Sequence, residues 1–220
     1  MFVRDRMNPD PVCGQQEMSA IEAKELMDKE GIQHLPIVDS SNVLVGLITG
    51  SSLLKALPSD VKSFSKFEVS YILSRIKVES IMIKDIITTD PDTPIEDAAF
   101  VLADKRIATM PVVVDGKLSG MISDKDLYFA MASMLGFRNP GIRVTIQQPD
   151  QSGLIARLTT AIAEKGGYLS VFVGYPSQNQ ENKWISVCKV ENINKDDLLN
   201  VINALEDAEI LDVRQYQEHK

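Results

Sequence analysis

The stretch GMISDKD, residues 120–126, has an earlier counterpart in GLITGSS, residues 46–52. Both begin with a glycine, continue with two apolar residues and then place a hydroxyl side chain at the same position. Each pattern is typical of a strand that ends in a turn and leads into a helix. The two stretches differ at their last residue, which is Ser52 in the first and Asp126 in the second. They therefore indicate an internal repeat whose copies differ in one carboxylate.

The repeat extends well beyond this turn. VRDRM at residues 3–7 aligns with VESIM at 78–82 at a shift of 75 residues, and HLPIVD at 34–39 aligns with TMPVVV at 109–114 at the same shift. GLIT aligns with GMIS at a shift of 74, because the second copy loses one residue in the intervening turn. Each copy has the pattern strand, helix, strand, strand, helix. A hairpin turn is expected at Asp115-Gly116, and a helix follows over residues 124–134.

The remaining segments have other patterns. Residues 61–77 predict a connecting helix that packs on the pair through Phe67, Tyr71, Ile72 and Ile76. The pattern after Gly136 predicts a ferredoxin-like βαββαβ unit. The fold class is therefore α+β with mixed α/β character. The expected domains are a first βαββα copy over 1–60, the connecting helix over 61–77, a second copy over 78–136 and the C-terminal domain over 141–216.

Composition narrows the classes of function. The net charge of −8 in 220 residues disfavours general binding to nucleic acids or to anionic membranes. Two distant cysteines and the lack of a long apolar run favour a cytoplasmic protein with no membrane partner. The only histidines are His34 and His219, and no known catalytic motif occurs. We therefore expect a protein that is not an enzyme, with no catalytic residue and no metal site.

The repeated turn itself has two chemical interpretations. The start of a helix offers free backbone N–H groups to an anion, so Ser123 could bind a phosphate there while Asp126 accepts hydrogen bonds from the two hydroxyls of a ribose. The same two residues could instead form an ordinary helix cap. The sequence of a single turn does not decide between them.

The two copies together resemble CBS domains, the tandem pair called a Bateman module, whose G-h-x-[ST]-x-x-D motif binds adenosyl ligands. The resemblance implies two clefts for adenine nucleotides, with Gly120 letting the chain turn close to the ligand, Ser123 on phosphate and Asp126 on ribose. The first copy keeps Gly46 and Thr49 but has Ser52 in place of the acid, which implies a weakened or adapted cleft. The nucleotide-binding residues expected by resemblance are Gly120, Ser123, Asp126, Met110, Pro111, Thr88, Thr89, Thr49 and His34.

The C-terminal segment resembles an ACT domain through PDQSGLIARLTTAIAEKGG, residues 149–167. The resemblance implies a possible amino-acid effector site at Asp150, Gln151, Ser152 and Gly153. Two departures from the family pattern, Ser152 in place of a proline and Leu169-Ser170 in place of Asn-Ile, favour a dimerisation role without a ligand.

The order CBS, CBS, ACT resembles the acetoin-utilisation B protein family. This implies a regulatory protein that senses AMP, ADP, ATP or a similar adenosyl ligand and signals to an unidentified metabolic partner in acetoin or acetate utilisation. No cofactor is required, although Mg²⁺ could accompany a polyphosphate. A homodimer through the CBS or ACT domains is expected. The alternative is a structural or dimerisation subunit with vestigial clefts.

Overall fold

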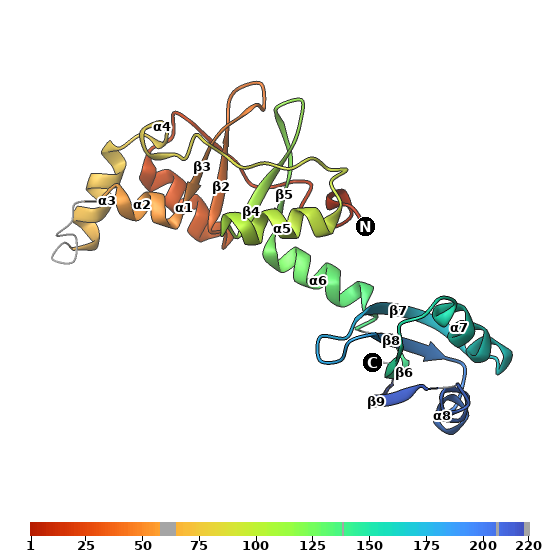
Figure 1. Cartoon of the computed structure of the whole chain (residues 1–220). Helices are drawn as coiled ribbons and strands as arrows, with labels where there is room; N and C mark the ends of the chain where they lie inside the picture. Colours follow the sequence, from red (N-terminus) through yellow and green to blue (C-terminus); the bar gives the residue numbers. More distant parts are fainter. Residues whose placement is uncertain (58–64, 138, 206, 218–220) are drawn as a thin grey trace. The chain divides into compact units, whose positions relative to one another are not determined.

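The structure is a computed structural model that describes the whole chain except residues 58–64, 138, 206 and 218–220 (Figure 1). Part of the predicted connecting helix, residues 61–64, and His219 therefore lie outside the described residues. The chain divides into two compact units, Met1–Tyr128 and Phe129–Lys220. Each unit is described by itself.

The first unit contains two copies of one arrangement, each with an antiparallel hairpin followed by a helix. Its elements are η1 (Val3–Asp5), β1 (Gly14–Gln15), α1 (Ala20–Glu30), β2 (His34–Val38), β3 (Leu44–Thr49), α2 (Gly50–Lys55), α3 (Lys66–Arg75), α4 (Val78–Ile81), α5 (Ile95–Lys105), β4 (Thr109–Val114), β5 (Lys117–Ser123) and α6 (Asp124–Met134), of which α6 continues into the second unit. The register of both hairpins shifts at the same place, between Ile37 and Val38 and between Val112 and Val113. This shared irregularity confirms the internal repeat.

The first strand in the repeated pattern of strand, helix, strand, strand, helix is very short in both copies. Residues 3–5 form the 3₁₀ turn η1 and residues 78–81 form α4, so neither VRDRM nor VESIM is a strand. Val78 and Met82 are one helical turn apart, and the Met82 N–H donates to the Val78 carbonyl at 2.9 Å. The strand of the first copy is the two-residue β1, parallel to β2, and its counterpart in the second copy is a single parallel bridge from Thr89 to Val112.

The two copies exchange their leading segments, by which we mean the residues that precede the first helix of each copy. Asn8 of the first copy bridges Met121 of β5, with N–H to carbonyl distances of 2.8 and 3.0 Å. Ile83 of the second copy bridges Leu47 of β3 in the corresponding way, at 2.9 and 3.0 Å. Each hairpin is therefore completed by the leading segment of the other copy.

The glycine of each repeated turn makes this exchange possible. A Cβ on Gly120 would lie 2.8 Å from the Asn8 carbonyl oxygen and from Met7 Sδ, and a Cβ on Gly46 would lie 2.2 Å from Met82 Sδ. Gly120 was expected to let the chain turn close to a ligand. That expectation stays a prediction, and the structure adds another role, since Gly120 lies within β5 and leaves room for the exchanged segment.

The connecting helix is confirmed over α3, but its packing face differs from the prediction. Phe67 and Tyr71 are 83% and 58% exposed, whereas Leu73 is 1% exposed and joins the core of the first copy. Val69 and Ile76 pack against that core together with Leu73. Of the predicted face, Ile76 packs inward as expected and Ile72 is half-buried, whereas the two aromatic side chains are exposed and Leu73 is the buried residue.

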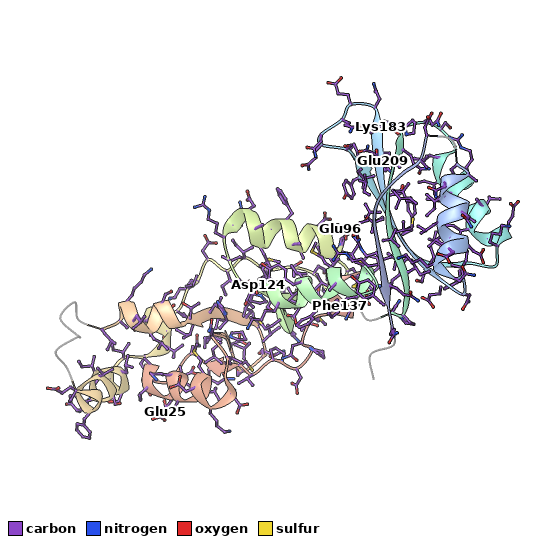
Figure 2. All side chains as sticks on the ribbon, turned by 90° about the horizontal axis from the view of Figure 1, so that it is seen from below. Glu25, Glu96, Asp124, Phe137, Lys183 and Glu209 are labelled. Carbon is purple, nitrogen blue, oxygen red and sulfur yellow. The ribbon has the colours of Figure 1, made fainter. Side chains whose placement is uncertain are left out.

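The second unit has the predicted βαββαβ order. Its elements after α6 are β6 (Gly141–Pro149), α7 (Leu154–Glu164), β7 (Tyr168–Pro176), β8 (Lys183–Glu191), α8 (Lys195–Asn203) and β9 (Glu209–Tyr216). The antiparallel sheet has the strand order β7-β8-β6-β9. Side chains of α7 and α8, such as Leu158, Ile162 and Leu198, form one core with the sheet (Figure 2). In the described part of the chain, no helix is long and apolar enough to cross a bilayer.

Candidate functional site

Both repeated turns form helix caps in this structure. The Ser123 N–H and hydroxyl donate to Asp126 Oδ2 at 2.8 and 2.6 Å, and the Asp126 N–H donates to Ser123 Oγ at 3.4 Å. In the first copy, the Ser52 N–H donates to Thr49 Oγ1 at 3.1 Å and the Thr49 N–H donates to Ser52 Oγ at 3.4 Å. Ser52 therefore takes part in the hydrogen bonds of its helix cap, and it is only 7% exposed. The cap interpretation accounts for these hydrogen bonds, and the two that reach the Asp126 carboxylate both end on Oδ2.

A cavity of about 390 Å³ lies between the two copies of the first unit. Its lining residues are His34, Leu47, Thr49, Ser51, Ile83, Asp85, Ile86, Ile87, Arg106, Ile107, Ala108 and Thr109. The hydroxyls of Thr49 and Ser51 come from the first copy, whereas residues 83–87 belong to the leading segment of the second copy. The cavity is thus a direct consequence of the exchange that joins Leu47 to Ile83.

Among the residues expected from sequence, Thr49 and His34 line this cavity and the others do not. Met110 is fully buried in the core and Pro111 is buried beside it in β4. The cap formed by Ser123 and Asp126 belongs to the other copy's turn.

The two threonines of the second copy's leading segment also lie outside this lining. Thr88 is exposed, and the Thr89 hydroxyl donates to Thr93 Oγ1 at 3.0 Å in the turn before α5. Sequence reasoning placed these threonines with the motif of their own copy. The Thr89 backbone does pair with Val112 of its own copy, whereas Ile83, earlier in the same segment, pairs with Leu47 of the first copy.

The cavity is also lined by a run of four residues that leads into β4, Arg106 to Thr109. This run was not predicted as part of the site. Arg106 adopts a left-handed conformation with φ of 53° at the end of α5, so the chain turns sharply there and exposes the side chains of Arg106 and Ala108. A signal for this segment was present in the repeat, because Thr109 aligns with His34. Since His34 was predicted at the site, its counterpart in the second copy, Thr109, could have been predicted at this edge of the cavity too.

His34 and Thr109 meet where the two copies approach each other. His34 Nδ1 lies 3.3 Å from Thr109 Oγ1. Partial burial lowers the pKa of His34 from its ordinary value, and the nearby Asp124 carboxylate opposes this effect. The imidazole is therefore neutral at pH 7 and contributes no positive charge to the cavity.

The lowered pKa of His34 predicts a pH dependence of stability. Between the folded pKa and the ordinary value of 6.5, the unfolded chain binds more protons than the folded chain, so the free energy of unfolding rises with pH in that window. Urea unfolding between pH 5 and 8 should show this rise in the native chain and a flatter profile in His34→Gln. Equal slopes for the two proteins would show that His34 does not contribute.

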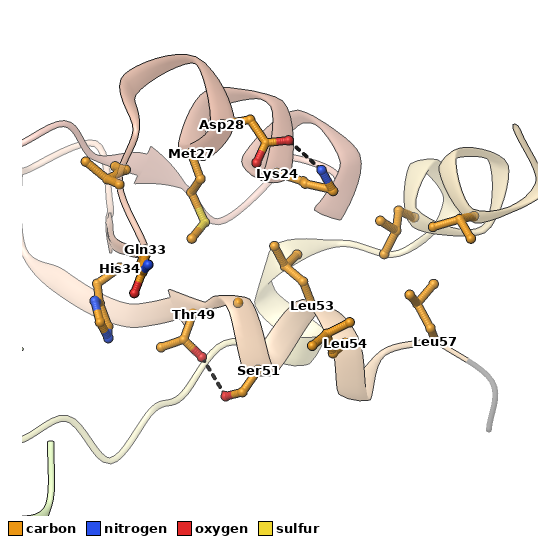
Figure 3. A pocket seen from close by; sticks show the side chains of 14 residues that line it. Lys24, Met27, Asp28, Gln33, His34, Thr49, Ser51, Leu53, Leu54 and Leu57 are labelled. Carbon is orange, nitrogen blue, oxygen red and sulfur yellow. Dashed lines mark hydrogen bonds and ion pairs between the residues drawn. The ribbon is translucent and has the colours of Figure 1, made fainter. Parts of the chain in front are cut away.

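A second cavity, of about 620 Å³, adjoins the first within the first copy (Figure 3). Its walls come from α1, α2 and α3 and are mostly apolar, with Met27, Leu53 and Leu73 among them. His34, Thr49 and Ser51 line both cavities. In Figure 3 these polar groups stand at one end, and the Lys24–Asp28 ion pair lies on α1.

The second unit has a cavity of its own at the turn between β6 and α7. Its volume is about 240 Å³, and three of the four predicted effector residues, Asp150, Gln151 and Gly153, line it together with Trp184. Beside it, three buried polar atoms have no hydrogen-bond partner among the described residues: Gln148 Oε1, Trp184 Nε1 and Ser186 Oγ. Gln148 pairs with Trp184 across the sheet, and Ser186 lies two residues further on the same face.

Comparison with known protein families identifies the family of the two repeated copies. A family model for the CBS domain matches residues 3–59 and 78–133. L-aspartate semialdehyde sulfurtransferase of Methanocaldococcus jannaschii is 30% identical over 127 residues, which is 57% of this chain and 22% of that protein. Homoserine O-acetyltransferase of Methanohalobium evestigatum is 34% identical over 129 residues, 57% of this chain and 23% of that protein. The chain therefore spans less than a quarter of the length of these relatives.

Three solved structures resemble the first unit. The CBS domain pair of protein MJ0100, in complex with 5′-methylthioadenosine and S-adenosyl-L-methionine, is 28% identical with a TM-score of 0.51 and covers 60% of this chain and 97% of its own. A protein from Vibrio cholerae described as AcuB, for acetoin utilization, is 26% identical with a TM-score of 0.53 over 62% and 94%. CBSX2 in complex with AMP is 27% identical with a TM-score of 0.50 over 60% and 97%.

Proposed function

Since this chain belongs to the CBS-domain family, with tandem domains in residues 3–59 and 78–133, we propose that it is a regulatory protein that binds an adenosyl ligand. The observation that carries the proposal is the cavity of about 390 Å³ between the two domains. Its volume falls within the usual range for small-molecule sites. It combines apolar walls, suited to an adenine ring, with a few polar groups at one side, and similar CBS pairs have been solved with AMP, 5′-methylthioadenosine and S-adenosyl-L-methionine.

We assign the polar contacts to a small set of residues. The hydroxyls of Thr49 and Ser51 and the guanidinium of Arg106 can bind ribose or its 5′ substituent, while Ile86 and Ile107 can enclose the base. The ligand then contacts both copies at once. Binding stabilises the packing arrangement that closes the cavity, and the resulting population shift is the signal.

The wider role is also a proposal. The chain would act without catalysis of its own, as a homodimer, on a metabolic partner protein, with acetoin or acetate utilisation as the candidate pathway. The likeness to the Vibrio cholerae protein described as AcuB supports this choice. The alternative is a structural subunit whose cavities bind nothing, and the next experiment separates the two.

Filling the cavity should abolish binding. Ala108 is exposed and lines the cavity, so Ala108→Trp is expected to weaken adenosine-family ligands at least tenfold in calorimetric titration of the full chain. Ala103→Trp, on an exposed position of α5 outside the lining, is the matched control and should bind as the native chain does. Absence of binding by AMP, ATP, 5′-methylthioadenosine and S-adenosylmethionine alike would favour the structural subunit.

Asp126 tests the second cleft expected from the family motif. If a nucleotide also binds there, Asp126→Ala should lower the number of ligands bound per chain. The binding that Ala108→Trp abolishes should remain in this variant. If it does not, Asp126→Ala should only cost the hydrogen bonds of the Ser123 cap, about 1 kcal/mol.

A second candidate function concerns the C-terminal unit. The cavity lined by Asp150, Gln151, Gly153 and Trp184 lies beside three unpaired buried polar atoms, and this observation favours a small polar ligand such as an amino acid over a purely structural turn. Trp184 is the single tryptophan of the chain, so its fluorescence reports on this site directly. A screen of the twenty amino acids that leaves this fluorescence unchanged would support the dimerisation role.

A further inference from the structure

The two cavities of the first unit adjoin, and three residues line both of them: His34, Thr49 and Ser51. Beyond these residues, most of the wall of the larger cavity is apolar and comes from α1, α2 and α3, although Lys24, Asp28 and Gln33 also line it. Leu54 of this wall is 68% exposed (Figure 3). A ligand in the smaller cavity could therefore extend an apolar group into the larger one.

The charges that line these cavities do not suit a phosphate ligand. In the smaller cavity Arg106 is opposed by Asp85, and in the larger one Lys24 is already paired with Asp28. His34 is neutral at pH 7 because burial lowers its pKa. No excess positive charge remains among the lining residues to balance AMP, and still less to balance ATP.

The turn that could hold a phosphate is also occupied by its own side chains. The N–H groups of Thr49 and Ser52 donate to the hydroxyls of the cap, and Thr49 Oγ1 lies 2.9 Å from Ser51 Oγ and 3.0 Å from Ser52 Oγ. A phosphate that accepts hydrogen bonds from these hydroxyls would compete with the cap for their protons, whereas a ligand without an anion would compete less.

We propose that the ligand is an adenosyl compound whose 5′ substituent is apolar and carries no negative charge, as in a 5′-alkylthioadenosine, with the adenosine in the smaller cavity and the substituent reaching the larger one. The inference rests on the proposed function and specifies its ligand class. One of the resembling CBS pairs was solved with 5′-methylthioadenosine, which has this chemistry.

The first test compares ligands on the native full-length chain. Calorimetric titration should give tighter binding for 5′-methylthioadenosine than for AMP, and ATP should bind more weakly than AMP. Lengthening the thioether from methyl to butyl should raise the affinity roughly fourfold for each methylene that enters the larger cavity. A flat series, or AMP or ATP binding more tightly than 5′-methylthioadenosine, would overturn this inference while leaving the proposed function intact.

The second test changes the charge at the shared boundary. Ser51→Lys places a cation between the cavities and should shift the ratio of the two affinities about tenfold toward AMP and away from 5′-methylthioadenosine. Ser70→Lys, on an exposed position of α3 outside both linings, adds the same charge and should change neither affinity. Equal effects of the two variants would contradict the boundary role of Ser51. Failure of every adenosyl ligand to bind the native chain would remove the proposed function together with this inference.

Discussion

Gly120→Ala is expected to lower the free energy of unfolding of the first unit by about 3 kcal/mol, at the upper end of the usual cost of overpacking. The added Cβ would lie 2.8 Å from the Asn8 carbonyl oxygen, which is backbone and cannot rotate away. The leading segment would have to move off β5, which loses both hydrogen bonds between Asn8 and Met121. Urea unfolding followed by far-ultraviolet circular dichroism measures the loss.

Two matched glycines make the test specific. Gly50→Ala is the control, because no atom lies within 4 Å of its added Cβ and alanine is the better helix former at this first position of α2. For Gly46→Ala, the three atoms nearest to the added Cβ all belong to the flexible side chain of Met82, so this variant should cost less and should be rescued in part by Met82→Ala. A Gly120→Ala protein as stable as the Gly50→Ala protein would refute the packing role of Gly120.

Lys189→Ala should destabilise the second unit by about 3 kcal/mol, because it removes a charged hydrogen bond and a cation–π contact from a buried position. Lys189 is only 3% exposed, its Nζ donates to the Gly136 carbonyl at 2.7 Å, and it lies 4.6 Å from the centre of the Tyr216 ring. Burial lowers its pKa, with Glu191 opposing and Arg143 adding to the effect. The fluorescence of Trp184 follows unfolding of this unit alone.

The conservative variant separates packing from polarity at this position. Lys189→Met keeps most of the apolar stem but removes the charged hydrogen bond to the Gly136 carbonyl, which then accepts only from the Asn139 N–H at 3.1 Å among the described residues, so a loss of about 2 kcal/mol is expected. Lys195→Ala, an exposed lysine at the start of α8, should change stability by less than about 0.5 kcal/mol. If Lys189→Met is as stable as the native chain, the hydrogen bond to Gly136 is not a significant source of stability.

Much of the fold could be predicted from the sequence, because strong local signals coincide with a repeat. The helix over residues 124–134, the Asp115-Gly116 hairpin and all six elements of the C-terminal sheet unit are found where patterning placed them. The inward face of α3 was mispredicted, because apolar periodicity alone does not distinguish aromatic residues at the surface from a neighbouring aliphatic stripe. Leu73, which the pattern did not single out, is the buried residue.

The candidate site was predictable in its residue types but not in its assembly. The sequence identified the hydroxyl of Thr49 and the imidazole of His34, and both line the cavity. It could not identify which leading segment faces which motif, since Ile83 and Leu47 are far apart in sequence and no local pattern encodes their pairing. The roles expected for Ser123 and Asp126 in ligand binding stay a prediction.

The exchanged leading segments also constrain how this chain can fold as it is synthesised. Asn8 is synthesised more than a hundred residues before its partner Met121, so the leading segment of the first copy stays unpaired until then, while the edge of β3 at Leu47 waits for Ile83. An unpaired edge is a template for another chain. Half of this pair, produced alone, would have to borrow the missing segment from a second molecule, so the smallest self-sufficient folding unit of this repeat is two copies.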